Sequence, residues 1–144
     1  MSATVRSMLE EKGRNVVTIA PDTTLADAAR ILEENHIGAA VVCDAKGKIA
    51  GIFTERDLVR AVGRSGSISL SQSVAAVMTK NVHCCSEETT VNELMEVMTG
   101  RRFRHVPVEK DGKLAGIISI GDVVKSRIRD IETEAEQIKA YIAG

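Results

Sequence analysis

Two pairs of side chains, each a hydroxyl followed three positions later by a carboxylate, are the best candidates for chemistry in this chain. Thr54 precedes Asp57, and Ser119 precedes Asp122. Three residues make nearly one helical turn, so both groups of a pair project from the same side of a helix start. A carboxylate can accept two hydrogen bonds from vicinal hydroxyls, as acidic residues do when they hold the ribose of a nucleotide. The alternative is helix capping, which the same residue types perform.

A cluster of cationic side chains at 101–105 directly precedes a predicted strand. Its members Arg102, Arg104 and His105 suit a phosphate group, because Arg donates in a fork to two anionic oxygens. The corresponding segment 35–39 holds no Arg, so two sites built on these segments should differ in their affinity for phosphate. The alternative is a solvated basic patch that pairs with Glu side chains.

Both features belong to a duplicated sequence. The segment Gly51–Val59 returns as Gly116–Val124, 65 positions later, and Thr23–Asp27 returns as Thr89–Glu93, 66 positions later. One residue is therefore lost from a predicted turn after Val108, which a repeated unit tolerates well. A copy of roughly 60 residues would have a marginal core alone, so the two copies should pack on each other.

Hydrophobic periodicity and turn residues predict the same order of elements in each copy: strand, helix, strand, strand, helix. In the first copy we expect a strand at 16–19, a helix from 25 that Gly38 stops, strands at 39–43 and 49–53, and a helix at 55–62. In the second we expect a strand at 82–85, a helix at 90–99, strands at 105–109 and 114–119, and a helix from 120.

The segments outside the copies are a short amphipathic helix ending near Gly13, a Gly- and Ser-containing linker at 63–73 and one apolar helical turn at 74–78. The last helix continues beyond the needs of the repeat, with Ile131, Ile138 and Ile142 on an apolar side that should meet something else. We therefore divide the chain into a lead-in (1–14), a first repeat (15–63), a linker (64–76), a second repeat (77–127) and a C-terminal helical extension (128–144).

Composition argues against several classes of protein. The net charge of −1 disfavours a nucleic-acid partner. No apolar run is long enough for a membrane span and the first residues do not form a signal peptide, so we expect a cytoplasmic protein. The three cysteines, Cys43, Cys84 and Cys85, form no disulfide framework and are interpreted as small buried hydrophobes, with a redox role as the alternative.

An enzyme is not expected. The chain has no Gly-x-Ser-x-Gly nucleophile elbow, no phosphate-binding Gly-rich loop ending in Gly-Lys-Ser/Thr, and no His/Cys pairing at metal-ligand spacing.

The pattern resembles a tandem pair of CBS (cystathionine β-synthase) domains. The resemblance rests on a Gly-x-x-Thr/Ser-x-x-Asp signature in both copies, the βαββα order and the lead Val77–Thr79 into the second copy, and it covers 15–127. The chain is similar in particular to small stand-alone bacterial proteins of this family. The resemblance implies an α/β (α+β) fold in which two βαββα repeats pack by pseudo-two-fold symmetry, with small mixed sheets flanked by helices.

The resemblance also implies a ligand: an adenosine compound such as AMP, ADP, ATP, NAD(H) or S-adenosylmethionine, bound in clefts between the repeats, with no cofactor or metal required. Asp57 and Asp122 would then hold ribose hydroxyls, and Thr54 and Ser119 would assist at the ribose or phosphate. The phosphate ligands implied are Arg102, Arg104 and His105.

The walls around the base are implied in the same way. For the Asp122 cleft they are Asn15, Val16, Ile37, Gly38, Ala39 and Ile117; for the Asp57 cleft they are Asn81, Val82, Phe103 and Ile52. The chain departs from the family at Gly38, which offers only backbone where a hydroxyl is frequent. Aromatic residues make up 2% of the chain, so aliphatic side chains and main-chain hydrogen bonds would recognise adenine.

Two functions follow as hypotheses. The first is a non-catalytic regulatory module that senses an adenosine compound and transmits binding to a regulated protein, with the chain as a homodimer. The second is a scaffold without ligand that dimerises or docks another chain through its long last helix, so that truncation after Arg129 would dissociate the dimer.

Overall fold

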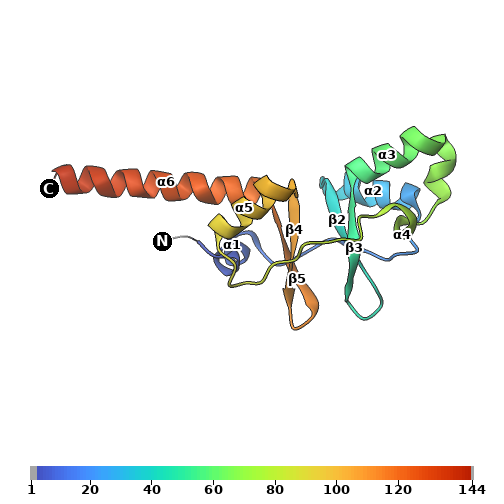
Figure 1. Ribbon diagram of the computed structural model, residues 1–144, viewed down its shortest axis with the longest axis horizontal. Helices are drawn as coiled ribbons and strands as arrows, with labels where there is room; N and C mark the ends of the chain where they lie inside the picture. The colour runs from blue at the N-terminus through green and yellow to red at the C-terminus, as the bar shows by residue number, and fades with distance from the viewer. Residues whose placement is uncertain (1–2, 144) are drawn as a thin grey trace.

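The computed structural model describes residues 3–143 as two repeats with a long helix at the C-terminal end (Figure 1). The first half contains α1 (Val5–Lys12), β1 (Thr18–Ile19), α2 (Leu25–Asn35), β2 (Ala39–Cys43), β3 (Ile49–Thr54), α3 (Glu55–Ser65) and the 3₁₀ helix η1 (Gly66–Ser71). The second half contains α4 (Val74–Val77), α5 (Val91–Arg101), β4 (His105–Lys110), β5 (Lys113–Ser119) and α6 (Ile120–Ala143).

Each repeat is built on a small sheet. In the first, β1 runs parallel to β2, and β2 runs antiparallel to β3; in the second, β4 and β5 form an antiparallel pair. The predicted strand at 82–85 is wrong except at its end, where Cys85 forms a single parallel bridge with Val108. Val82 donates its N–H to the carbonyl of Lys80 (2.9 Å), so the chain makes a tight local turn there instead of a ladder.

Two predicted boundaries also differ from the structure. Helix α2 ends before Gly38, because His36 adopts a left-handed conformation (φ 53°) and its N–H donates to carbonyls of the last turn. Arg102 (φ 60°) ends α5 at the equivalent place in the second repeat. The predicted linker at 63–73 is largely helical, since α3 continues to Ser65 and η1 follows it.

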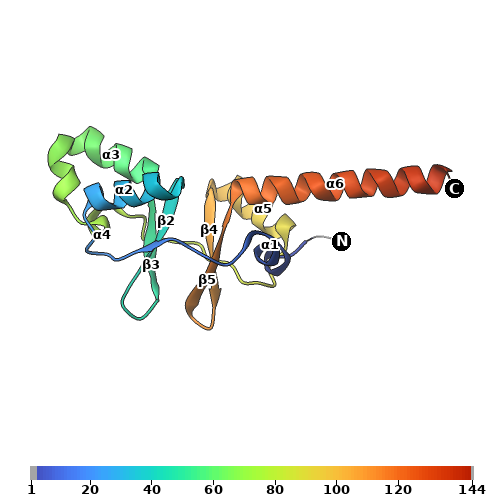
Figure 2. The same cartoon turned by 180° about the vertical axis from the view of Figure 1, so that it is seen from behind.

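The two lead-in helices are exchanged between the repeats. Helix α1 precedes the first repeat but packs on the second, where the N–H of Val5 donates to the carbonyl of Thr89 (2.8 Å). Helix α4 precedes the second repeat but packs on the first, where the N–H of Val74 donates to the carbonyl of Thr23 (2.7 Å). The equivalence of these contacts shows the pseudo-two-fold pairing of the repeats, which Figures 1 and 2 show from opposite sides.

Each lead-in helix completes a separate hydrophobic core, which makes neither repeat self-sufficient. The core of the first repeat consists of Ile19, Leu25, Ala28, Leu32, Ala40, Val42, Phe53, Ala61 and Val74. The core of the second consists of Val5, Met8, Leu9, Val91, Leu94, Met98, Val106, Val108, Ile118 and Val123. The predicted fold class, a mixed α/β chain with small sheets flanked by helices, is confirmed.

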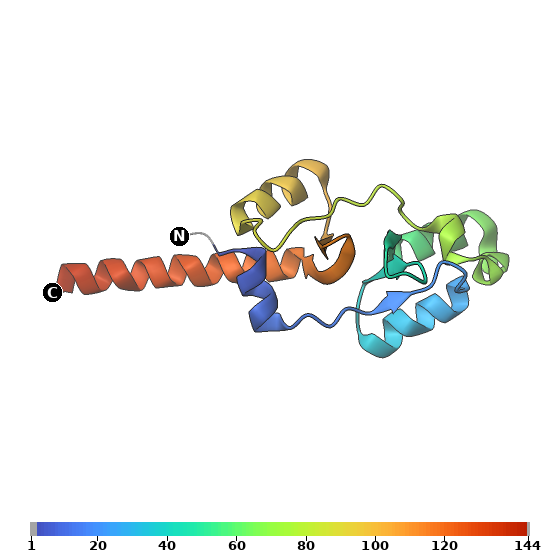
Figure 3. The same ribbon diagram turned by 90° about the horizontal axis from the view of Figure 1, so that it is seen from below.

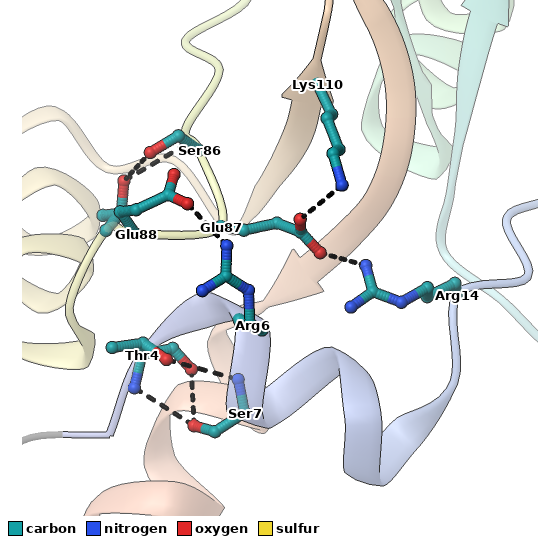
Figure 4. Close-up of polar contacts among 9 residues, drawn as sticks. Thr4, Arg6, Ser7, Arg14, Ser86, Glu87, Glu88 and Lys110 are labelled. Carbon is teal, nitrogen blue, oxygen red and sulfur yellow. Dashed lines mark hydrogen bonds and ion pairs between the residues drawn. The ribbon is translucent and has the colours of Figure 1, made fainter.

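A buried carboxylate fastens the segment after α1 to the second repeat (Figure 4). Glu87, whose side chain is 5% exposed, accepts from Arg14 and lies 3.6 Å from the ammonium of Lys110. The Arg14 hydrogen bond lowers the pKa of Glu87, against the opposing effect of burial. Nearby, Arg6 pairs with Glu88 (2.6 Å) on the surface.

The first turn of α6 packs on the second repeat, where Val123 is 2% exposed, and its later turns extend away from both repeats. Seen from below, its C-terminal part projects as a single rod (Figure 3). Within residues 3–143, no helix combines the length and the apolar character needed to cross a membrane.

A candidate ligand cleft between the repeats

A cleft of about 480 Å³ lies where the first repeat meets the second. Its volume falls within the roughly 300–1,000 Å³ of small-molecule sites. The first repeat contributes the end of β3 and the start of α3, and the second contributes the segment between α5 and β4. The lining residues are Gly38, Ile52, Thr54, Glu55, Arg56, Val59, Thr79, Arg102, Phe103, Arg104 and His105.

The first-repeat side of the cleft is the capped start of α3. The hydroxyl of Thr54 accepts from the N–H of Asp57 (3.2 Å), and the carboxylate of Asp57 accepts from the N–H of Thr54 (2.9 Å). Asp57 is 6% exposed and lines a neighbouring groove with Arg60 and Arg64. The structure therefore places Thr54 in the cleft and the carboxylate of Asp57 in a capping box beside it.

The second-repeat side carries the cationic cluster. The carbonyl of Arg104 accepts from the N–H of Ile120 (2.8 Å), as the carbonyl of Gly38 accepts from the N–H of Glu55 (2.9 Å) at the equivalent place in the first repeat. Within residues 3–143, none of the ion pairs involves Arg102 or Arg104. Both guanidiniums are therefore available to an anionic ligand.

Two further side chains of the lining, Phe103 and His105, are a ring that stacks on a neighbour and a titratable imidazole. Phe103 stacks on His83 with ring centroids 6.0 Å apart. Burial lowers the pKa of His105 and so favours its neutral imidazole, an effect that the nearby carboxylates of Asp122 and Glu55 oppose. The cleft thus offers permanent charge through Arg and a titratable donor through His.

A carboxylate that the sequence analysis missed lies on the opposite wall. Glu55 sits so close to Gly38 that a Cβ added at the glycine would lie 3.0 Å from its Oε1. Gly38 therefore gives room to this side chain. Four residues line the cleft without having been predicted: Glu55, Arg56, Val59 and Thr79. The signal for the first three was their position within five residues of the Thr54 cap, and the signal for Thr79 was the lead into the second repeat.

In the second repeat, the carboxylate of Asp122 is paired with a lysine of α1. The ammonium of Lys12 lies 2.6 Å from Asp122 Oδ2 and 3.0 Å from the carbonyl oxygen of Ile117. Burial opposes ionisation of Asp122, but the Lys12 hydrogen bond and the N–H of Ser119 outweigh it and lower its pKa. Any ligand held by Asp122 would have to compete with this lysine.

The predicted base-wall residues are divided among several places. Ile52 and Phe103, predicted for one cleft, and Gly38, predicted for the other, line the same cleft, and its lining does not include Asn81 or Val82. Asn15 and Val16 line a separate broad groove of about 920 Å³ beside the two hairpin turns. Ile37 packs against the first core, Ala39 pairs with Thr54 across β2 and β3, and Ile117 pairs with Pro107.

The cysteines are unpaired and partly buried. Burial raises the pKa of Cys84 to about 11 and that of Cys85 to about 12, so both remain thiols at neutral pH. In the part of the chain that the structure describes, no three His, Cys, Asp or Glu side chains are placed to hold a metal ion.

Comparisons with known proteins identify the family and the fold. The CBS domain family matches twice, at residues 10–64 and 74–129. The crystal structure of a CBS-domain containing protein from Agrobacterium tumefaciens is 58% identical, with a TM-score of 0.84 over 88% of this chain and 95% of that one. The mitochondrial CBS domain-containing protein CBSX3 of Arabidopsis thaliana is 34% identical over 99% of this chain and 73% of its own length.

A more distant structure shares the fold. The CBS domain pair of protein MJ0100, solved in complex with 5′-methylthioadenosine and S-adenosyl-L-methionine, is 24% identical, with a TM-score of 0.78 over 87% of this chain and 95% of that one. With both repeats matched by the family and the paired arrangement found in these structures, the chain belongs to the CBS domain family as a protein with two CBS repeats.

Proposed function

We propose that this chain is a non-catalytic regulatory module that binds an adenosine-containing ligand, such as AMP, ADP, ATP or NAD(H), in the cleft between its repeats. The observation that carries the proposal is the composition of the cleft. It combines the capped helix start at Thr54 from one repeat with the unpaired Arg102 and Arg104 from the other. A ligand bound there would touch both repeats and would favour one arrangement of the pair over another.

The side chains of the cleft divide naturally among the parts of a nucleotide. Arg102 and Arg104 would take the phosphate, and Thr54 would donate to the phosphate or ribose. Ile52 and Phe103 would flank the base. Ribose binding by Asp57 stays a prediction, because that carboxylate now caps α3, and the same role for Asp122 requires displacement of Lys12.

The effect of ligand binding on a regulated protein is part of the same proposal. We infer that the chain acts in the cytoplasm as a homodimer and that the ligand changes the arrangement of the repeats, which a regulated protein detects. Glu55 lines the same cleft as Arg102 and Arg104, so a phosphate bound there should lie nearer to the guanidiniums than to this carboxylate, which repels it.

A thermal-shift panel of the nucleotide-free chain with AMP, ADP, ATP, NAD, NADH and S-adenosylmethionine tests this function. The last compound is included because a protein of the same fold was crystallised with it. A ligand at a hundred times its dissociation constant should stabilise the fold by about 2.7 kcal/mol. The double variant Arg102→Ala/Arg104→Ala should reduce the shift caused by phosphate-bearing ligands by about half or more, since a 10-fold loss of affinity leaves about 1.4 kcal/mol at that concentration.

The matched control is Arg60→Ala/Arg64→Ala, which removes the same charge from the neighbouring groove. It should leave the shift intact. A panel without any shift, for a chain shown to be folded and free of nucleotide, would reject the sensor and favour the second candidate, a scaffold. The observation behind that candidate is the exposed apolar side of α6, where Ile138 is 60% and Ile142 77% exposed.

A further inference from the structure

The free part of α6 carries a regular apolar seam. Successive apolar residues are spaced alternately four and three positions apart, which is the spacing of the a and d positions of a coiled coil. They are Val124, Ile128, Ile131, Ala135, Ile138 and Ile142. With Ile128, Ala135 and Ile142 at a, the positions d fall on Val124, Ile131 and Ile138.

This seam lies open to solvent. Ile128 is 52% and Ile131 51% exposed, and every residue at 131–143 is exposed. The rod formed by this part of α6 stands clear of the other described elements in all three views (Figures 1, 2 and 3). A single apolar strip on an otherwise polar helix is unfavourable in water, so this surface calls for a partner helix.

The charges beside the seam specify that partner and its direction. In a parallel pair of identical helices, each g position faces the e position five residues further along the partner. Arg127 would then face the partner's Glu132, and Glu134 would face the partner's Lys139. Both contacts join opposite charges, and symmetry provides each of them twice.

An antiparallel pair does not satisfy the same charges. In the antiparallel register that covers all six apolar residues, Ile128 lies opposite the partner's Ile138. Glu132 would then face the partner's Glu132, and Glu134 would face the partner's Glu134. Like charges in these positions disfavour that orientation.

We propose that α6 forms a parallel, in-register, two-stranded coiled coil with α6 of a second copy of this chain over residues 124–142. The seam is about 27 Å long at 1.5 Å per residue. The coil holds the two globular bodies side by side at its N-terminal end. This inference does not depend on the proposed ligand, because it uses only residues of α6.

Sedimentation of the full chain over a range of concentrations tests the interface. We expect a dimer, and the variant Ile131→Lys/Ile138→Lys should raise its dissociation constant at least about 100-fold, because two ammonium groups of each chain would be buried in the seam without partners. The matched control Gln137→Lys/Ala140→Lys adds the same charge at positions c and f and should leave the dimer intact. A monomer or trimer of the unsubstituted chain, or equal effects of the two variants, would overturn the proposal.

Two variants test the orientation. Ala135→Cys places a thiol opposite its own copy only in the parallel register, so mild oxidation should give a covalent dimer that the unsubstituted chain, with its three native cysteines, does not form. Lys139→Glu should weaken the dimer by facing the partner's Glu134, and Glu134→Lys/Lys139→Glu should restore it. Failure of Ala135→Cys to cross-link, or a tighter dimer with Lys139→Glu, would show that the helices are not parallel.

Discussion

Replacing Lys12 by methionine should loosen the attachment of α1 to the second repeat. The ammonium of Lys12 lies 2.6 Å from Asp122 Oδ2 and also donates to the carbonyl of Ile117 (3.0 Å). Methionine keeps most of the aliphatic length but can make neither contact. The substitution therefore isolates the polar tie while it preserves packing against the neighbouring helix.

The size of the effect follows from exposure. The side chains of Lys12 and Asp122 are 34% and 23% exposed, so solvent screens the pair and its coupling should be about 0.5–1 kcal/mol. A loss of about 1 kcal/mol corresponds to a fall of roughly 3 °C in Tm for a chain of this size. The pKa of Asp122 is lowered in the folded state, so its contribution is present at neutral pH and is lost only as pH falls through that lowered pKa.

A double-mutant cycle measures the coupling directly. Urea unfolding of the unsubstituted chain, Lys12→Met, Asp122→Asn and the double variant at pH 7 should give a coupling of this size, reduced in 1 M salt, where the screening length is about 3 Å. Lys125→Met is the matched control, because Lys125 lines a small surface groove together with Lys12 and Asp122 but takes part in none of the ion pairs within residues 3–143. A coupling of zero, or an equal loss in the control, would refute the reasoning.

Three further perturbations have defined outcomes. Gly51→Ala should lower the free energy of unfolding by about 2–3 kcal/mol, because the new Cβ would lie 2.7 Å from a backbone carbonyl oxygen. Gly116→Ala should lower it by only about 1 kcal/mol, because its Cβ would lie 2.7 Å from a leucine side chain that can move. Thermal unfolding of the two variants compares these losses, and equal losses would contradict this explanation. The lowered pKa of His105 means that folding stability falls as the pH drops below about 6.5, the ordinary pKa of histidine. In urea titrations at several pH values, His105→Gln should reduce this fall in stability. An unchanged pH dependence would show that another group causes it. The raised pKa values of Cys84 and Cys85 predict at least about 100-fold slower reaction with a thiol reagent at pH 8 than in denaturant, whereas equal rates would show reactive thiols.

The duplication in the sequence was sufficient to predict both repeats. Thr54 caps the helix that follows it, which was the alternative interpretation of the Thr54 and Asp57 pair, and Thr24 and Thr90 cap their helices in the same way. These are local interactions, in which the partners lie three positions apart. Hydrophobic periodicity also located the sheets, apart from the first strand of the second repeat.

Contacts between distant segments could not be predicted in this way. Lys12 and Asp122 are 110 positions apart, and no local pattern marks them as partners. The left-handed residues that end α2 and α5 are His36 and Arg102, and neither is the glycine that usually signals such an end. The exchange of α1 and α4 likewise depends on how the repeats pair.

Many residues of the candidate site could be predicted from the sequence, but which of them share one cleft could not. The cationic segment and Thr54 do line one cleft, together with the predicted Ile52 and Phe103. Glu55 was missed because an acidic residue at the start of a helix is already explained by the helix dipole. Its contact with Gly38 becomes visible only when β2 and β3 are paired.

Calorimetric titration of the nucleotide-free chain with AMP tests the central claim, that the cleft between the repeats binds an adenosine ligand through its arginines. We expect saturable binding that Arg102→Ala/Arg104→Ala weakens at least about 10-fold, since a hydrogen bond to a charged group contributes roughly 1.5–3 kcal/mol. Arg60→Ala/Arg64→Ala should bind as the unsubstituted chain does. Binding that is unchanged by loss of Arg102 and Arg104, or lost equally in both double variants, would contradict the account.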